Sequence, residues 1–205
     1  LALLREVVRR AEATDLRTRR QWAWLLALYE GRFDDLDAIA AQWAPEMLQA
    51  GSGLTLPRSF FTANNAWFRG DRERARSAAS EARRDFERQL ASRKDADRFA
   101  FFPAFTAAME GDAPAARRWL DTEERYARSM NDAVALKSNW YSRLLAMTFL
   151  GERDATLDLL ERALADPVGG GEIADAAQIA IDPTWKDLRD DPRFKAIIAK
   201  HRPKD

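Results

Sequence analysis

Apolar residues recur along this chain at every third or fourth position, the spacing that gathers side chains on one face of an α-helix. Leu36, Ile39 and Trp43, for example, follow Gly31 at this spacing. Strand-favouring residues are scarce, with 4 Val and 6 Ile among 205 residues, whereas the helix formers Ala, Leu, Arg and Glu are abundant. The pattern and the composition together predict an all-α protein.

One helical pattern occurs four times. Each copy centres on a glycine: Gly31, Gly70, Gly111 and Gly151. These glycines are 39, 41 and 40 residues apart, a large apolar residue stands two positions before each, and a charged residue follows each. Glycine suits the left-handed backbone that ends a helix, and an acidic residue suits the first turn of the next helix. We therefore predict four helix pairs over residues 16–168, preceded in residues 1–15 by the second helix of an earlier repeat.

The end of the chain has a pattern of its own. The stretch IDPTWKDLRDDPRFKAIIAK, residues 181–200, contains two Asp-Pro pairs, each with an aromatic residue two positions after the proline. Proline is favoured at the first position of a helix, and the last unit of a repeat array must cover its apolar face. Residues 169–205 are therefore predicted to form a connector through Gly169–Gly171 and C-terminal capping helices. Their apolar residues are expected to pack inward: Trp185, Leu188, Phe194, Ile197 and Ile198.

Ala75, Ala79 and Ala82, which stand five, nine and twelve residues after Gly70, resemble the pattern of tetratricopeptide repeats. The usual period of that family, about 34 residues, is shorter than the spacing here. The closing string DPTWKDLRDDPRFKAIIAK is similar to the end of the tetratricopeptide modules of bacterial winged-helix transcription regulators and of bacterial serine/threonine kinases of eukaryotic type. This resemblance implies a superhelical array of antiparallel helix pairs. It also implies that the chain, which opens at Leu1 in a helical pattern, is a piece of a larger regulatory protein.

The resemblance further implies a binding groove, because the first helices of tetratricopeptide pairs line a concave surface. The residues at the inward positions, with Arg98 as an added polar group, are Gln21, Leu25, Phe60, Asn64, Trp67, Arg98, Phe101, Phe105 and Tyr141. Such a groove suits an extended or helical peptide, or a small apolar ligand. The alternative is that these aromatic side chains pack against neighbouring helices as core. Pro103 is expected to kink the helix that carries Phe101 and Phe105.

Few residues of this chain are suited to catalysis. Cysteine is absent, and the one histidine, His201, lies four residues from the end, where a frayed tail is expected. Adjacent acidic residues point apart on a helix, so we interpret the acidic pairs as solvated helix starts. These pairs are Asp34-Asp35, Glu123-Glu124 and Asp190-Asp191. The three glycines Gly169–Gly171 lack the Lys-Ser/Thr that follows a phosphate-binding loop. No catalytic, metal or cofactor site is predicted, and the chain is not expected to be an enzyme.

The charge distribution bears on possible partners. The 33 basic and 33 acidic residues cancel, so no overall field favours a polyanion or a membrane surface. The stretch from Arg69 to Lys94 is rich in arginine, but acidic residues interleave with it, as in the pair Arg83 and Glu87, which fits a solvated helix. The longest apolar run, Trp22–Tyr29, has eight residues, whereas a membrane-spanning helix needs about 20.

We therefore predict a non-catalytic protein-interaction or ligand-sensing module of a larger bacterial regulator. Its expected partner is a protein or peptide, with a small-molecule effector as a further option, while nucleic-acid binding and membrane insertion are not expected. The alternative is an all-α enzyme or a nucleic-acid-binding domain that uses the groove or the arginine-rich helix over residues 71–92. The expected compartment is the cytoplasm, or an extracytoplasmic location if the parent protein has an upstream transmembrane helix.

Overall fold

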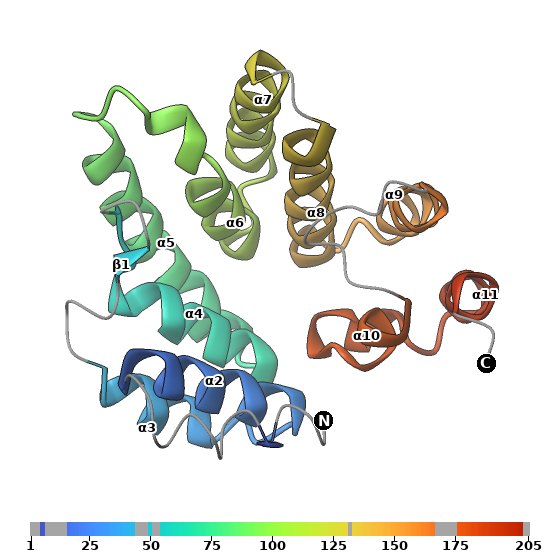
Figure 1. Ribbon diagram of the computed structural model, residues 1–205. Coiled ribbons are helices and arrows are strands. Elements are labelled where there is room, and N and C mark those ends of the chain that lie inside the picture. The colour runs from blue at the N-terminus through green and yellow to red at the C-terminus, as the bar shows by residue number, and fades with distance from the viewer. Residues whose placement is uncertain are drawn as a thin grey trace. The chain divides into compact units, whose positions relative to one another are not determined.

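The computed structural model describes residues 5–6, 16–43, 49–50, 54–130, 133–166 and 176–202. Most of them are helical, as the composition predicts (Figure 1). The helices are α2 (Leu16–Tyr29), α3 (Asp35–Ala41), α4 (Arg58–Arg69), α5 (Arg72–Leu90), η2 (Ala96–Phe99), α6 (Phe101–Glu110), α7 (Ala113–Ser129), α8 (Ala133–Leu150), α9 (Arg153–Ala165), α10 (Ala176–Ile181), η3 (Pro183–Leu188) and α11 (Pro192–His201). Strands β1 (Gln49–Ala50) and β2 (Leu54–Thr55) form a short antiparallel ladder between α3 and α4. The fold is all-α.

The four repeat glycines end helices in one shared way. Gly31, Gly70, Gly111 and Gly151 have φ values of 70°, 87°, 93° and 74°, the left-handed region that glycine adopts without strain from a Cβ atom. At the third corner the N–H of Asp112 donates to the carbonyl of Ala107 at 2.9 Å, and that of Gly111 to Ala108 at 3.1 Å. This Schellman pair of bonds recurs at the other three corners, so the four glycines occupy equivalent positions, as their spacing predicts.

The chain divides into two compact units, Leu1–Ala82 and Arg83–Asp205, with the boundary inside α5. In the first unit α3 packs against α2 and α4. Aromatic rings fill this core, since Trp43 meets Phe61 edge-on with centroids 4.6 Å apart and Phe33 stacks on Phe68 at 6.0 Å. These contacts join the residues on either side of α3 to α4, which explains how so short a helix as α3 is held in place.

In the second unit α6, α7 and α8 pack against one another, and α8 also packs on α9. Because α6 and α7 are joined by the two-residue turn Gly111–Asp112 and pack together, they run antiparallel. Four fully buried alanines allow these two helices to approach closely: Ala104, Ala107, Ala108 and Ala116. Between α6 and α8, Phe105 meets Phe149 edge-on with ring centroids 4.7 Å apart. Small and aromatic residues thus fit together in this core.

The C-terminal segment forms short helices that begin at its two Asp-Pro pairs. Pro183 and Pro192 occupy the first turns of η3 and α11, and the carboxylates of Asp182 and Asp191 cap these helices by accepting from backbone N–H groups. The helix η3 packs on α8, and α11 packs on α9 and α10. All five residues expected to face inward are 7% exposed or less: Trp185, Leu188, Phe194, Ile197 and Ile198. The segment therefore covers the side of the fourth helix pair.

Successive second helices of this unit are linked by a recurring ion pair. In each pair, an arginine of one helix contacts the acidic residue that directly precedes another helix two or more elements later in the chain. The arginine lies inside α5 in the first pair and near the start of its helix in the other two. The pairs are Arg83 with Asp112 at 3.1 Å, Arg117 with Glu152 at 2.5 Å, and Arg153 with Asp191 at 2.6 Å. Each of these partly exposed ion pairs stabilises the protein little by itself.

The structure corrects three expectations about single residues. Pro103 does not kink a helix, because α6 begins at Phe101 and Pro103 lies in its first turn, where the missing N–H would have no intrahelical partner. Arg83, which we expected to pair with Glu87 along its own helix, makes its ion pairs with Glu110 and Asp112. His201 is not in a frayed tail, because it is half-buried in the last turn of α11.

Some predicted segments lie outside the described residues. They include the connector glycines Gly169–Gly171 and almost all of residues 1–15. The predicted division into an earlier repeat, four pairs over residues 16–168 and a terminal segment over residues 169–205 therefore stays a prediction.

Candidate functional site

The predicted groove residues of the first unit differ in how much of each side chain is exposed. Leu25 and Phe60 are half-buried, and part of each side chain reaches solvent. Asn64 is 7% exposed, and its amide donates to the carbonyl of Phe60 at 2.7 Å, within its own helix. Trp67 is buried beneath Arg72, whose guanidinium carbon lies 3.5 Å from the ring centroid. Gln21 lies in α2, but its side chain is outside the described structure.

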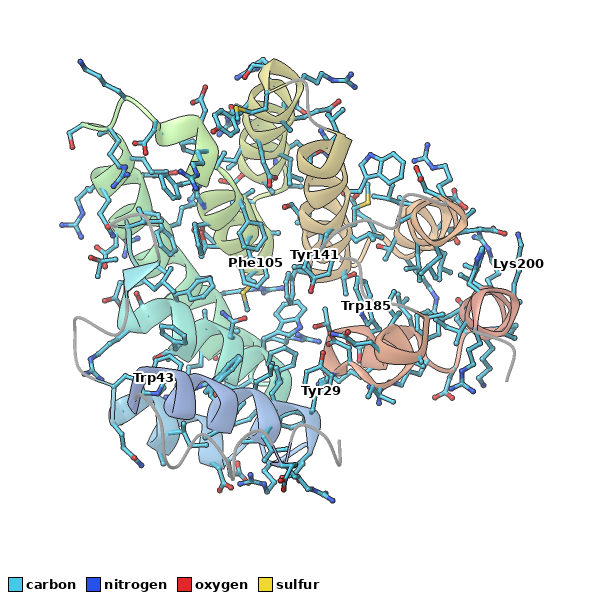
Figure 2. All side chains as sticks on the ribbon, viewed as in Figure 1. Tyr29, Trp43, Phe105, Tyr141, Trp185 and Lys200 are labelled. Carbon is cyan, nitrogen blue, oxygen red and sulfur yellow. The ribbon has the colours of Figure 1, made fainter. Side chains whose placement is uncertain are left out.

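The predicted groove residues of the second unit include a more accessible set. Phe101 on α6 and Tyr141 on α8 are half-buried, and these two helices pack together. Phe105, labelled in Figure 2, is 6% exposed, and its ring centroid lies 5.4 Å from that of Phe101. Arg98 on η2 is exposed, with its guanidinium 5.7 Å from the ring of Phe99. Of the predicted groove residues of this unit, Phe101, Tyr141 and Arg98 reach the surface, whereas Phe105 belongs to the core.

A polar cluster that the sequence did not reveal lies in the first unit, around the buried Asn65. Asn65 has no exposed surface, accepts from the indole N–H of Trp24 at 3.2 Å and donates to Asp37 at 2.7 Å. The other oxygen of Asp37 accepts from Arg69 at 2.9 Å and from Arg74 at 3.2 Å. The cluster therefore ties α2, α3, α4 and the start of α5 together.

The charge state of Asp37 follows from this cluster. Burial disfavours its ionised form, but the Asn65 amide and the guanidinium groups of Arg69 and Arg74 outweigh burial and lower the pKa of Asp37 below its ordinary value. The carboxylate is thus held ionised as part of the structure. A cavity of about 190 Å³ adjoins it, lined also by Phe61 and Thr62, so the carboxylate has some access to solvent.

A weak sequence signal for Asn65 did exist. Asn65 stands five residues before its turn glycine, and the equivalent residues of the first and fourth copies are the apolar Leu26 and Ala146. The third copy has Thr106, which is also fully buried and bonds to the carbonyls of Phe102 and Pro103. A polar residue at a position that is apolar in other copies therefore indicated a buried hydrogen-bonding role, although it did not indicate the partner.

A second polar cluster joins α7 to α8 and corrects one expectation. Glu123 and Glu124 are not a solvated helix start, because they lie within α7. Glu123 accepts from Asn139 at 3.1 Å and from Ser142 at 2.8 Å. Glu124 accepts from Arg128 at 2.6 Å and from Arg143 at 2.7 Å. Hydrogen bonding to Arg128, and further to Arg143, outweighs partial burial and lowers the pKa of Glu124.

Asn139 is the centre of this second cluster. It is 2% exposed, its amide also lies 3.3 Å from the carbonyl of Leu120, and its oxygen accepts from Arg143 at 3.2 Å. The guanidinium of Arg143 is thereby held at a fixed place on α8, between Asn139 and the acidic residues of α7. Both polar clusters join helices to one another.

No group of three or more His, Cys, Asp or Glu residues that could hold a metal ion occurs in the described ranges. No helix among those described is long and apolar enough to cross a membrane.

No family model matches this chain, and comparison with the curated proteins and with the solved structures gives no match.

Proposed function

We propose that this chain is a non-catalytic module that binds a peptide segment of a partner protein, within a larger regulatory protein of bacterial type. The observation that carries the proposal is the pair of half-exposed aromatic residues Phe101 and Tyr141, on two helices that pack together. Aromatic side chains on a rigid support are the residues that most often anchor peptides, because they bury a large area at little cost in conformational entropy. Arg98, exposed on the neighbouring η2, can pair with an acidic group of the peptide.

The repeated corners support the tetratricopeptide-like part of the proposal. Helix pairs that end at equivalent Schellman glycines about 40 residues apart, together with a terminal cap, are what a stacked array requires. In such an array the first helices α6 and α8 present one continuous surface. The proposed peptide lies along this surface of the second unit, across both helices.

The contacts of the arginine-rich helix argue against the nucleic-acid alternative. Arg74 pairs with Asp37, Arg83 pairs with Glu110 and Asp112, and the guanidinium of Arg72 covers the ring of Trp67. Phosphate binding needs cations that are free to replace the counterions of the nucleic acid. These three arginines are already engaged inside the protein.

A selection experiment followed by matched substitutions tests the proposal. Peptides are selected from a random phage-displayed library on the purified chain, and their affinities are measured by fluorescence polarisation. We expect Phe101→Ala and Tyr141→Ala to lower the affinity for the selected peptides by about tenfold or more. Tyr126→Ala, which removes a half-buried tyrosine from the second helix α7, serves as the control and should leave affinity unchanged. Circular dichroism confirms that each variant is folded.

Two results would contradict the proposal. Selection could yield no peptide that binds in solution, or the selected peptides could lose as much affinity with Tyr126→Ala as with Tyr141→Ala. Loss of binding in a high concentration of salt without any effect of the aromatic substitutions would favour a purely electrostatic surface instead.

A further inference from the structure

A pocket of about 390 Å³ opens in the second unit between α7, α8 and α9. Its volume falls within the range of small-molecule sites, about 300–1,000 Å³. Trp140 lines this pocket, whereas its neighbour Tyr141 belongs to the proposed peptide surface. Consecutive residues on a helix point about 100° apart, so the pocket and the peptide surface lie on different faces of α8. The pocket is therefore a second feature, separate from the proposed peptide site.

The floor of the pocket is apolar. Leu136, Trp140 and Met147 of α8 stand four and seven residues apart, which places them on one face of the helix, and Leu159 of α9 completes the floor. The three α8 side chains are only half-buried, although large apolar residues on a helix normally lie against a neighbouring element. This face of α8 is thus incompletely covered by the described part of the unit, and an indole ring lies within it.

The rim of the pocket carries three arginines. Arg128 and Arg143 both bind Glu124, at 2.6 and 2.7 Å, and Arg143 also binds Asp121 at 3.0 Å. Their charges are therefore largely compensated, and the guanidinium of Arg143 is fixed by its partners. Glu123 points to Asn139 and Ser142 and does not line the pocket.

The third arginine of the rim differs from the other two. Arg162 of α9 is exposed and has no ion pair or hydrogen bond within the residues that the structure describes. One guanidinium without a counter-ion thus stands at the edge of an apolar floor that contains an indole ring. A guanidinium binds a carboxylate through two parallel hydrogen bonds, and an indole ring accepts an offset-stacked aromatic ring.

We propose that this pocket binds a small aromatic monocarboxylate, with the ring of the ligand against Trp140 and its carboxylate on Arg162. A single charge is specified because only Arg162 lacks a counter-ion, while a dianion such as a phosphate ester would be repelled by the nearby Glu124. The apolar floor specifies the aromatic body of the ligand. The module thereby has a place for a small effector apart from its peptide surface.

Calorimetric titration with two related probes tests this site. The probes are 3-phenylpropionate and the neutral 3-phenylpropan-1-ol, which share the aromatic ring and differ in the charged group. We expect the carboxylate to bind the native chain and the alcohol to bind at least about tenfold more weakly, because the alcohol lacks the charge-assisted hydrogen bonds. Arg162→Ala should weaken the binding of the carboxylate by a similar factor and leave the affinity for the alcohol unchanged. Arg118→Ala, which removes an exposed arginine of α7 outside the pocket, is the matched control.

The same titrations contain the results that would overturn the proposal. Equal affinity of the acid and the alcohol would show an apolar patch without charge recognition. Equal weakening by Arg162→Ala and Arg118→Ala would show a general effect of charge, and the absence of binding by both probes at millimolar concentration would exclude this ligand class. Tighter binding of benzyl phosphate than of 3-phenylpropionate would contradict the preference for one charge. Trp140→Leu, checked for folding by circular dichroism, should weaken both probes.

Discussion

The Nε atom of Arg153, at the start of α9, lies 2.6 Å from Oδ2 of Asp191, the residue that caps α11. The other oxygen of the same carboxylate accepts from the backbone N–H of Arg193 at 2.7 Å. The Arg153 side chain, followed by the backbone N–H of Arg193, lowers the pKa of Asp191. One side chain thus begins the last helix and joins it to the fourth helix pair.

Substitutions of Asp191 separate these two roles. Asp191→Asn keeps a capping oxygen but removes the charge, whereas Asp191→Ala removes both the cap and the ion pair. We expect the melting temperature to fall by a few degrees in Asp191→Ala and by clearly less in Asp191→Asn, measured by circular dichroism. Equal decreases in the two variants would show that the ion pair, and not the cap, is the important contact.

Trp185 tests whether the capping helices are part of the folded core. Its side chain is 1% exposed, so Trp185→Ala should lower the free energy of unfolding by about 3–5 kcal/mol, the usual cost of deleting a buried aromatic side chain. Ile181→Ala is the control, because Ile181 is 47% exposed and its truncation should change stability by about 0.5 kcal/mol or less. Urea denaturation followed by far-ultraviolet circular dichroism measures both. Similar values for the two variants would mean that the cap is not packed as described.

Substitutions of Gly111 test whether the helix corners need a residue that adopts the left-handed backbone conformation. A Cβ atom at Gly111 would meet no other atom within 4 Å, so any loss of stability in Gly111→Ala comes from its φ of 93°. We expect a loss of about 1–2 kcal/mol. Gly111→Asn should lose less, since asparagine tolerates the left-handed region better than alanine does. Chemical denaturation of the two variants checks this order, and a Gly111→Ala protein as stable as the native one would contradict it.

Asn64 and Asn65 are adjacent buried asparagines with different roles, and each serves as a control for the other. Asn65→Ala removes the bonds to Trp24 and Asp37 across helices, so we expect a loss of about 1–3 kcal/mol. Asn64→Ala removes one bond to a carbonyl of its own helix and replaces asparagine by a better helix former, so its loss should be below about 1 kcal/mol. Urea denaturation gives both values, and the reverse order would be inconsistent with the cluster around Asn65.

The lowered pKa of Asp37 predicts how the free energy of unfolding depends on pH. Its pKa is lower in the folded protein than the ordinary 3.8, so the unfolded chain takes up the proton first as the pH falls. The stability that the Asp37 carboxylate contributes is therefore complete above about pH 5 and is lost as the pH falls through 3.8 towards the folded-state pKa. Denaturation of the native protein and of Asp37→Asn at pH 7 and pH 3 measures this, and the variant should lose less stability on acidification. An equal loss in both would show that other carboxylates dominate.

Much of the fold could be predicted from the sequence where short-range effects decide it. The left-handed conformation at Gly70 or Gly151 depends on the absence of a Cβ atom, and the start of α11 depends on Asp191 followed by Pro192. Such features depend only on neighbouring residues, so a short stretch of sequence is enough to predict them. The candidate groove was less predictable, because its pattern selected Phe101 and Phe105 alike, although the structure buries Phe105 against Phe149 and leaves Phe101 partly exposed.

The sequence by itself determined the helical class, the four equivalent corners and the starts of η3 and α11, because helix propensity, glycine conformation and N-terminal capping act within a few residues. Only the tertiary structure decided the partners of the polar side chains. Asn65 reaches Asp37 over 28 positions of sequence and Arg83 reaches Asp112 over 29, and no local pattern specifies such pairs. They depend on which faces of distant helices meet, which is set by the packing of the whole core.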